Sequence, residues 1–399
     1  MANVSSSNGL EKRPRLAFRN TDGSHFPCWR QTSLGCIIEP YSEKVYGEHD
    51  YEVLTSSREG LQRQEDHFGS KQRHDTDGYN IIPLGYCTYR NRSDDGKFAF
   101  NINTISEKAI VSKFYPVFRF TNANSTFMAE FLNSSPRVKK KLSVLAVGTS
   151  QVVLSFEALK AAKFDLPCKD EQDKIAAFLE CLNTRIENQR TLVVALKKYK
   201  RGVVDGIFSR KLNFSYPQTW AELEISELFM PISDKGYSDK IVLTIVQGEG
   251  TMPRDSVDRR IAYDKSTISS YKRVLPNDFI LHLRSFEGGL EIVNEEGVVS
   301  PAYTILRARK EIIPLFFYTF FRSYWFINSK LRISVEGIRD GKSINMNTFW
   351  HIKVPVPSIE EQRHISALIS SIDNRIKIAE FEYKRLLQIR VGLMQQLFI

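Results

Sequence analysis

The chain has 399 residues, enough for two or three domains that each bury a core of their own. Its net charge of +10 and its isoelectric point near 9.2 weakly favour a polyanionic partner. No segment is apolar enough for a signal peptide or a membrane span, and the five cysteines and seven histidines lack disulfide or metal-ligand spacing. We therefore expect a cytoplasmic protein with reduced cysteines, no membrane contact and no structural metal.

Residues 1–165 are predicted to form a first globular domain. Short β-type runs such as AIVSKFYPVFRF (109–120) precede an aromatic helical stretch, FMAEFLNSS (127–135). Basic side chains interleaved with Gln, Asn and Tyr are typical of loops that contact DNA bases and phosphates, although any single one can be an ordinary surface charge. The candidate DNA-binding residues here are Arg58, Arg63, Lys71, Arg73, Arg90 and Arg92.

Residues 166–212 are predicted to contain a first long helix. Its apolar residues recur at alternating spacings of four and three from Ile175 to Ile207, which is the seam pattern of a coiled coil. About 40 helical residues would extend roughly 60 Å. A long core helix is the alternative, but compact domains rarely contain a helix of this length.

Residues 213–355 are predicted to form a second globular domain related to the first. GVVSPAYTILRA (297–308) matches the strand region 109–120, and LFFYTFFRS (315–323) repeats the aromatic helical stretch. The same reasoning about basic loops gives a second set of candidate DNA-binding residues. They are Arg254, Arg259, Arg260, Lys272, Arg273, Arg284, Arg339 and Lys342.

Residues 356–399 are predicted to contain a second long helix, with a capping box formed by Ser358 and Glu361 at its start. Shifting the chain by 190 positions aligns 163–208 with 353–398, and 11 of these 46 positions are identical without a gap. The whole chain is therefore an internal repeat of domain and helix. We predict a mixed α/β fold with two globular domains and two long helices in an antiparallel coiled coil, the two halves being related by a pseudo-twofold axis.

Several identities in the two helices have more than one interpretation. The Glu-Gln pairs at each helix start either complement the helix dipole or help to dock partner subunits. Gly202 and Gly392 each cost about 1 kcal/mol relative to alanine, so we expect close backbone approach where the helices cross, or else a gentle kink. The candidate partner-binding residues are Glu171, Gln172, Arg185, Glu361, Gln362 and Arg375.

Enzymatic motifs are weak throughout the chain. GIRDGKS (337–343) has three residues between its glycines, where a phosphate-binding loop has four. The Glu-x-Lys at 382–384 lies in the predicted coil, and no catalytic triad, dinucleotide fingerprint or methyltransferase motif is present. We expect no catalytic residue and no activity from this chain alone.

The order of parts, the two helix openings, LTSSREGLQRQEDHF (54–68) and VVSPAYTILRA (298–308) resemble the specificity subunit of type I restriction–modification systems. This resemblance implies that each globular domain is a target-recognition domain reading one half of a bipartite target in double-stranded DNA. It also implies that the helices space the domains and dock two methyltransferase (M) subunits, joined by two restriction (R) subunits where restriction operates.

By the same resemblance, AdoMet, ATP and Mg²⁺ would be bound by the partner subunits, with no cofactor in this chain, and the host would be bacterial or archaeal. Two other classes of protein stay open on the residues alone. One is a coiled-coil scaffold that binds other proteins through its globular domains, and the other is a nuclease or ATPase with an unrecognised site.

Overall fold

The computed structural model describes residues 14–69, 75–212, 219–257, 265–282, 288–337 and 342–398. The chain divides into two compact units. The first unit comprises Met1–Gln189 with Glu382–Ile399, and the second unit comprises Arg190–Phe381. Each long helix therefore contributes one part to each unit, and the units are described separately below.

The first unit contains two four-stranded sheets, two-stranded pairings and short helices, built from residues 30–166. One sheet has the strand order β2-β10-β6-β8, and the other has the order β4-β3-β9-β5. Its elements are β1 (Arg30–Ser33), η1 (Leu34–Cys36), β2 (Ile38–Tyr41), β3 (Glu52–Ser57), β4 (Gly60–Arg63), α1 (Gln64–Phe68), β5 (Asn80–Pro83), β6 (Cys87–Tyr89), β7 (Arg92–Ser93), β8 (Phe100–Ile102), β9 (Lys108–Val111), β10 (Val117–Phe120), α2 (Ser125–Ser134), α3 (Pro136–Leu145), β11 (Val152–Val153), α4 (Phe156–Ala161) and β12 (Lys163–Leu166).

The second unit repeats this plan with residues 221–356. Its four-stranded sheet has the order β14-β21-β18-β19. Its elements are β13 (Ala221–Glu224), α6 (Ile225–Leu228), β14 (Phe229–Ile232), β15 (Leu243–Val246), β16 (Gly250–Pro253), η2 (Arg254–Ser256), η3 (Lys265–Ser270), β17 (Lys272–Val274), β18 (Phe279–His282), β19 (Glu291–Ile292), β20 (Gly297–Val299), β21 (Tyr303–Ala308), α7 (Pro314–Phe321), η4 (Phe326–Lys330), η5 (Leu331–Ser334), β22 (Val335–Glu336), β23 (Ser343–Ile344), α8 (Met346–Trp350) and β24 (Lys353–Val356).

The correspondence between the two domains follows the repeat seen in the sequence. In each main sheet the serine–tyrosine segment supplies a central strand, β10 or β21, which pairs antiparallel with β2 and β6 or with β14 and β18. In each domain the first strand pairs antiparallel with the strand that leads into a long helix, β1 with β12 and β13 with β24. The aromatic stretches form α2 and α7, as predicted.

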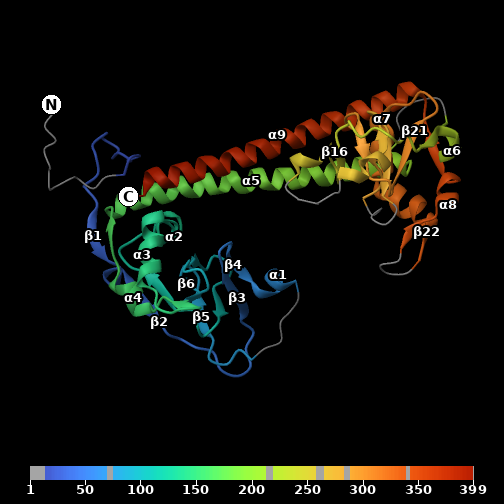
Figure 1. Cartoon of the computed structure of the whole chain (residues 1–399). Coiled ribbons are helices and arrows are strands. Elements are labelled where there is room, and N and C mark those ends of the chain that lie inside the picture. The colour runs from blue at the N-terminus through green and yellow to red at the C-terminus, as the bar shows by residue number, and fades with distance from the viewer. Residues whose placement is uncertain are drawn as a thin grey trace. The chain divides into compact units, whose positions relative to one another are not determined.

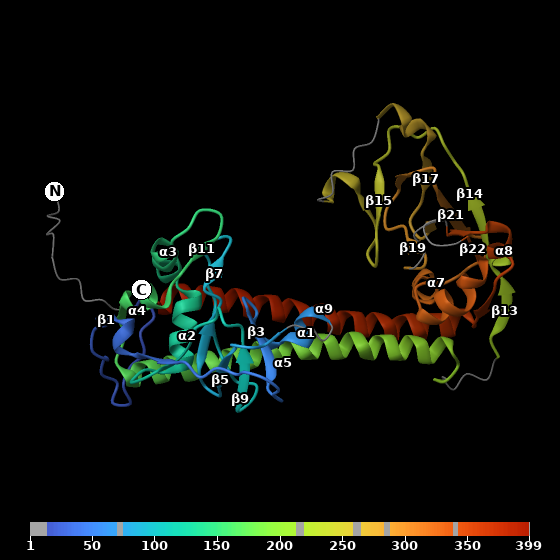
Figure 2. The same cartoon turned by 90° about the horizontal axis from the view of Figure 1, so that it is seen from below.

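The long helices are α5 (Lys169–Phe208) and α9 (Ile359–Leu397), which contain 40 and 39 residues. They run side by side in both views (Figures 1 and 2). In the first unit the start of α5, at Ile175 and Leu179, packs in one core with Met394 and Leu397 near the end of α9. In the second unit the end of α5 packs against the start of α9, so the antiparallel arrangement predicted from the seam is confirmed.

Matching aromatic contacts join each helix end to its domain. The ring of Phe398 lies 5.8 Å from Phe127 and 5.5 Å from Phe131 on α2. Phe208, its counterpart in the repeat, lies 5.5 Å from Phe316 and 5.0 Å from Phe320 on α7. Edge-to-face packing of buried rings accounts for the identity of this terminal phenylalanine in both copies.

The repeated glycines do not mark a helix crossing. A Cβ placed on Gly202 or Gly392 would meet no described atom within 4 Å, so the predicted close backbone approach is wrong for these residues. Both helices continue through the glycine without a break. Each seam buries apolar side chains on its inner face, and the glycines lie away from it.

Candidate nucleic-acid interface

One predicted residue of the first domain, Arg58, shares a carboxylate with a neighbouring lysine. Arg58 lies in the turn between β3 and β4, where it forms an ion pair with Asp95. Lys97 approaches the same carboxylate at 3.5 Å. Burial opposes ionisation of Asp95, but hydrogen bonds from Ser93 and from the backbone of Lys97, with the charge of Arg58, lower its pKa to about 2. The carboxylate of Asp95 thus keeps the exposed side chains of Arg58 and Lys97 close to each other.

Arg63, Arg90 and Arg92 of the predicted set are exposed as well. Arg63 at the end of β4 pairs with Glu52 across the hairpin at 3.0 Å. Arg92 stacks on Phe114, with its guanidinium carbon 4.7 Å from the ring centroid. Lys113 lies 5.7 Å from the same ring. Arg92, Lys113 and the exposed Phe114 ring thus form a cation–π cluster on the surface.

The second domain places its predicted residues less uniformly. Arg273 on β17 pairs with Glu296 at 2.9 Å and lies over the ring of Tyr237 at 4.6 Å. Lys272 donates to the carbonyl of Tyr303 at 2.7 Å, and burial followed by the charge of Lys235 lowers its pKa. Arg254 begins η2 and is half-buried, whereas Lys342 is exposed. Lys272 and Arg273 thus contribute to the structure of the domain surface as well as to its charge.

Six of the predicted residues lie outside the described residues. They are Lys71, Arg73, Arg259, Arg260, Arg284 and Arg339.

A basic run on α3 was not among the predicted residues. Arg137, Lys139 and Lys140 are exposed there, and Lys141 lies 5.1 Å over the ring of Phe164. The signal was visible in the sequence as RVKKK at 137–141, since four cations in five residues mark a strongly charged helix face.

Each domain is joined to the start of its long helix by a Glu-Gln clamp. Glu171 accepts from the indole N–H of Trp29 at 3.2 Å. Gln172 accepts from the backbone N–H of Asn124 at 2.9 Å and donates to the carbonyl of Pro167 at 3.0 Å. The side-chain amide thereby ties the start of α2 to the strand–helix turn.

The second unit contains the same clamp at the matching positions. Glu361 accepts from Trp220 Nε1 at 2.9 Å. Gln362 accepts from the backbone N–H of Ile313 at 2.9 Å and donates to the carbonyl of Pro357 at 3.0 Å. This repeated set of contacts is a structural reason why both pairs recur, and it is a third role beside the two considered from the sequence.

The clamp leaves these side chains little surface to offer a partner. Glu171, Gln172, Glu361 and Gln362 are between 1% and 4% exposed. By contrast, the side chains of Arg185 on α5 and Arg375 on α9 are exposed at matching positions of the repeat. The partner-binding role of the six residues stays a prediction, and Arg185 and Arg375 are the two whose side chains are exposed.

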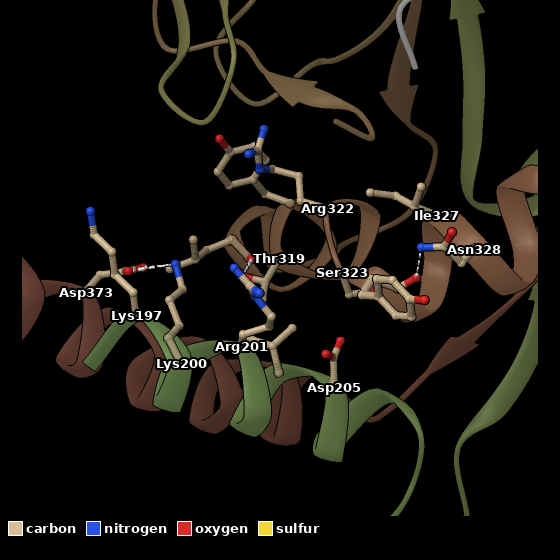
Figure 3. A pocket seen from close by; sticks show the side chains of 14 residues that line it. Lys197, Lys200, Arg201, Asp205, Thr319, Arg322, Ser323, Ile327, Asn328 and Asp373 are labelled. Atoms are coloured by element: carbon tan, nitrogen blue, oxygen red, sulfur yellow. Dashed lines mark hydrogen bonds and ion pairs between the residues drawn. The ribbon is translucent and has the colours of Figure 1, made fainter. Parts of the chain in front are cut away.

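A basic crevice lies between each domain and the helix pair of its own unit. The first crevice, about 680 Å³, lies among β4, β8, α2 and residues Asn183 and Arg390 of the long helices. The second crevice, about 450 Å³, lies between α7 and the stretch of α5 that carries Lys197, Lys200 and Arg201 (Figure 3). Burial raises the pKa of Asp205 in the second crevice, although a backbone N–H of Trp325 and the charge of Arg201 oppose this rise.

The family comparison agrees with this duplicated arrangement. The family model described as "Type I restriction modification DNA specificity domain" matches residues 39–196 and 217–388. The chain belongs to this family. Each matched segment contains most of one specificity domain and most of the long helix that follows it.

An individual relative shares a low sequence identity with this chain. A protein assigned as the MjaX specificity subunit of a type I restriction enzyme in Methanocaldococcus jannaschii is 23% identical over 258 residues, or 60% of this chain. The alignment spans 59% of that relative, so the chain matches less than two thirds of its length.

Solved structures share the fold of this chain. The type I restriction–modification S subunit from M. genitalium gives a TM-score of 0.54 at 18% identity, covering 97% of this chain and 99% of that one. A chain from a study of complex assembly and conformational transition of the type I R-M system gives 0.56 at 16% identity, covering 93% and 97%. The HsdS subunit of Thermoanaerobacter tengcongensis gives 0.50 at 15% identity, covering 93% and 96%. At these identities the likeness shows the fold.

The residues considered for nuclease or nucleotide-binding chemistry form no such site in the part of the chain that the structure describes. Glu382 of the Glu-x-Lys sequence pairs with Arg385 on the same helix at 3.6 Å. Residues 338–341 of GIRDGKS lie outside the described residues. Within the described ranges, no group of three or more His, Cys, Asp or Glu side chains is arranged to hold a metal ion. No helix in that part of the chain is long and apolar enough to cross a membrane.

Proposed function

We propose that this chain reads a bipartite target in double-stranded DNA, one half with each specificity domain, and positions methyltransferase subunits on it. The carrying observation is the duplicated clamp, in which two divergent domains are fastened to two similar helices through the same Trp–Glu and Gln–backbone contacts. A shared attachment with different loops suits two modules that bind the same polymer but read different bases.

The basic residues on the loops supply the chemistry of reading and holding DNA. Arg58, Arg90 and Arg92 of the first domain are exposed on turns, where guanidinium groups can reach base edges or phosphates. In the second domain Lys342 is exposed in the same way, and the half-buried Arg254 and Arg273 add positive charge. Salt should weaken binding steeply, because each phosphate contact releases counterions.

The partner subunits would supply the catalysis. In this proposal two methyltransferase subunits dock on the long helices through surfaces that include Arg185 and Arg375, and restriction subunits join the same assembly. AdoMet, ATP and Mg²⁺ would be bound by those partners, and this chain would hold none of them. Calorimetric titration of the isolated chain with AdoMet should then show no binding.

The test is to co-express the chain with the methyltransferase encoded beside it and to map methylated bases in the host DNA. The expected result is one split motif with an unread spacer, absent when this chain is omitted. A chain whose second domain is replaced by that of another specificity protein is the informative variant, because only one half of the motif should then change. Unchanged methylation despite a stable complex would contradict the proposal and favour a protein-binding scaffold.

A further inference from the structure

The two crevices are the same feature of the repeat. Five residues of α2, within 126–134, line the first crevice. The residues 189 positions later line the second crevice, and they belong to α7 and the segment just after it. Glu130 corresponds in this way to Thr319, and Ser134 to Ser323. The long helices contribute Asn183 and Arg390 to one crevice and Asp373 and Lys200 to the other, again at matching positions.

Although most of these side chains differ, the crevices have the same number of charged lining residues. Each is lined by four cations and two carboxylates. In the first crevice these residues are Arg58, Lys97, Lys139, Arg390, Glu59 and Glu130. In the second they are Lys197, Lys200, Arg201, Arg322, Asp205 and Asp373. Retaining charge while the side chains change favours a ligand that is anionic and the same at both sites.

Most of the cations have carboxylate partners within their own unit. Lys200 lies 2.6 Å from Asp373, Lys197 lies 2.6 Å from Glu380, and Arg322 pairs with Glu291. Arg201 has no such partner in the described part of the chain, and Figure 3 shows it reaching from α5 toward Thr319 on α7.

The first crevice has a matching free cation. Arg390 pairs with Glu130 at 2.7 Å, and both Lys97 and Arg58 pair with Asp95. Lys139 on α3 is exposed and makes no ion pair with any residue that the structure describes. Each crevice therefore presents one cation, Lys139 or Arg201, that makes no ion pair with a described residue, and Ser134 or Ser323 belongs to the same lining.

We propose that each crevice holds a segment of the DNA sugar–phosphate backbone, with Lys139 and Arg201 each contacting a phosphate. This inference rests on the proposed DNA-binding function and assigns to it two contacts that carry no sequence information. Cations beside hydroxyl and amide donors are the groups that proteins use for phosphate oxygens. Because every nucleotide has the same phosphate, the lining residues can diverge as long as the charge persists.

The test uses the complete complex with its methyltransferase and compares Lys139→Ala and Arg201→Ala with two matched controls. Lys140→Ala and Lys198→Ala remove neighbouring exposed charges that do not line a crevice. Dissociation constants are measured at several salt concentrations on target and non-target DNA. Each crevice variant should weaken both by about fivefold and lower the slope of log K against log salt by about 0.9, as expected for one lost phosphate contact.

Further measurements distinguish the inference from its alternatives. The methylated motif should stay unchanged, and Arg201→Lys should keep most of the affinity because the charge is retained. Salt slopes equal to those of wild type, or equal losses in the control variants, would overturn the inference. So would loss of methyltransferase binding in sedimentation, which would make the crevices protein-docking sites, or tight binding of AMP to the isolated chain, which would make them nucleotide sites. If the wild-type complex itself shows no preferred sequence, the proposed function fails.

Discussion

Lys200 and Asp373 form an ion pair of 2.6 Å between α5 and α9 in the second unit. The matching positions in the first unit are Arg390 and Asn183, joined by a hydrogen bond of 2.9 Å. Since Asn183 carries no charge, the carboxylate for Arg390 comes from Glu130 on α2, which accepts from its guanidinium at 2.7 Å. Each seam thus contains one cation at this position of the repeat. Its carboxylate partner lies on the other long helix in the second unit and on α2 of the domain in the first unit.

Because the carboxylate comes from different positions in the two units, we predict that a substitution on α5 can compensate for the loss of Glu130 on α2. Glu130→Thr, which introduces the residue found at the matching position of the second unit, should destabilise the first unit by about 1–3 kcal/mol, because a part-buried guanidinium loses its carboxylate. Adding Asn183→Asp should restore more than half of this loss by supplying the carboxylate from α5. Hydrogen-exchange protection of α2 peptides would measure both effects, and a double variant no better than Glu130→Thr would contradict the prediction.

Removal of the clamp should allow the second domain to open locally. Gln362→Ala should destabilise this unit by about 1–3 kcal/mol, because it leaves the backbone N–H of Ile313 and the carbonyl of Pro357 without the side-chain amide. Exchange of the Ile313 amide should accelerate correspondingly. Gln388→Ala on the exposed surface of the same helix is the matched control and should change stability by less than about 0.5 kcal/mol. Equal effects of the two substitutions would show that the clamp is not stabilising.

The helix glycines predict a gain in stability. Gly202→Ala and Gly392→Ala should each stabilise the isolated chain by about 0.5–1 kcal/mol, because the new methyl group meets no described atom and alanine favours the helix. Thermal unfolding of the isolated chain would measure this gain. If assembly with the methyltransferase weakens at the same time, the bare helix surface is a docking surface for that partner. Destabilisation of the isolated chain would mean that an intramolecular contact had been missed.

Asp95 predicts both a pH dependence and a change in DNA binding. Because its folded pKa of about 2 lies below the ordinary 3.8, its contribution to stability is complete above about pH 5 and is lost as the pH falls through the folded value. Asp95→Asn should remove this dependence, as followed by acid titration of the folded chain. It should also release Arg58 and Lys97 and so strengthen non-target DNA binding at low salt. Weaker binding would show that Asp95 positions these cations for DNA.

The length of the long helices predicts the length of the unread spacer. Inserting seven residues at matched places in α5 and α9 keeps the seam in register and adds about 10 Å of helix. The methylated motif should then gain about three unread base pairs, at 3.4 Å each, with both half-sites unchanged. Inserting the heptad in only one helix is the control and should disrupt the seam. An unchanged spacer in the double insertion would refute a spacer role for the helices.

The sequence by itself determined the architecture, because the information is local and repeated. The seam from Ile175 to Ile207 and its copy from Ile365 to Leu397 require only the helical period, and the shift of 190 residues makes the duplication visible without any contact. The serine–tyrosine segments likewise gave central strands in both sheets. Exposed cations such as Arg58 and Arg92 could be proposed for DNA, although nothing in the chain order distinguishes a base contact from a surface charge.

Only the tertiary structure decided what the repeated polar residues do. The partners of Glu171 and Gln172 are Trp29 and Asn124, which are 142 and 48 positions away, so no local pattern connects them. The carboxylate partner of Arg390 could not be found from a local pattern either, because Glu130 lies 260 positions away on α2. Hydrogen bonds and ion pairs act over about 3 Å in space, and it is the packing of each domain onto its helix pair that brings these groups within reach.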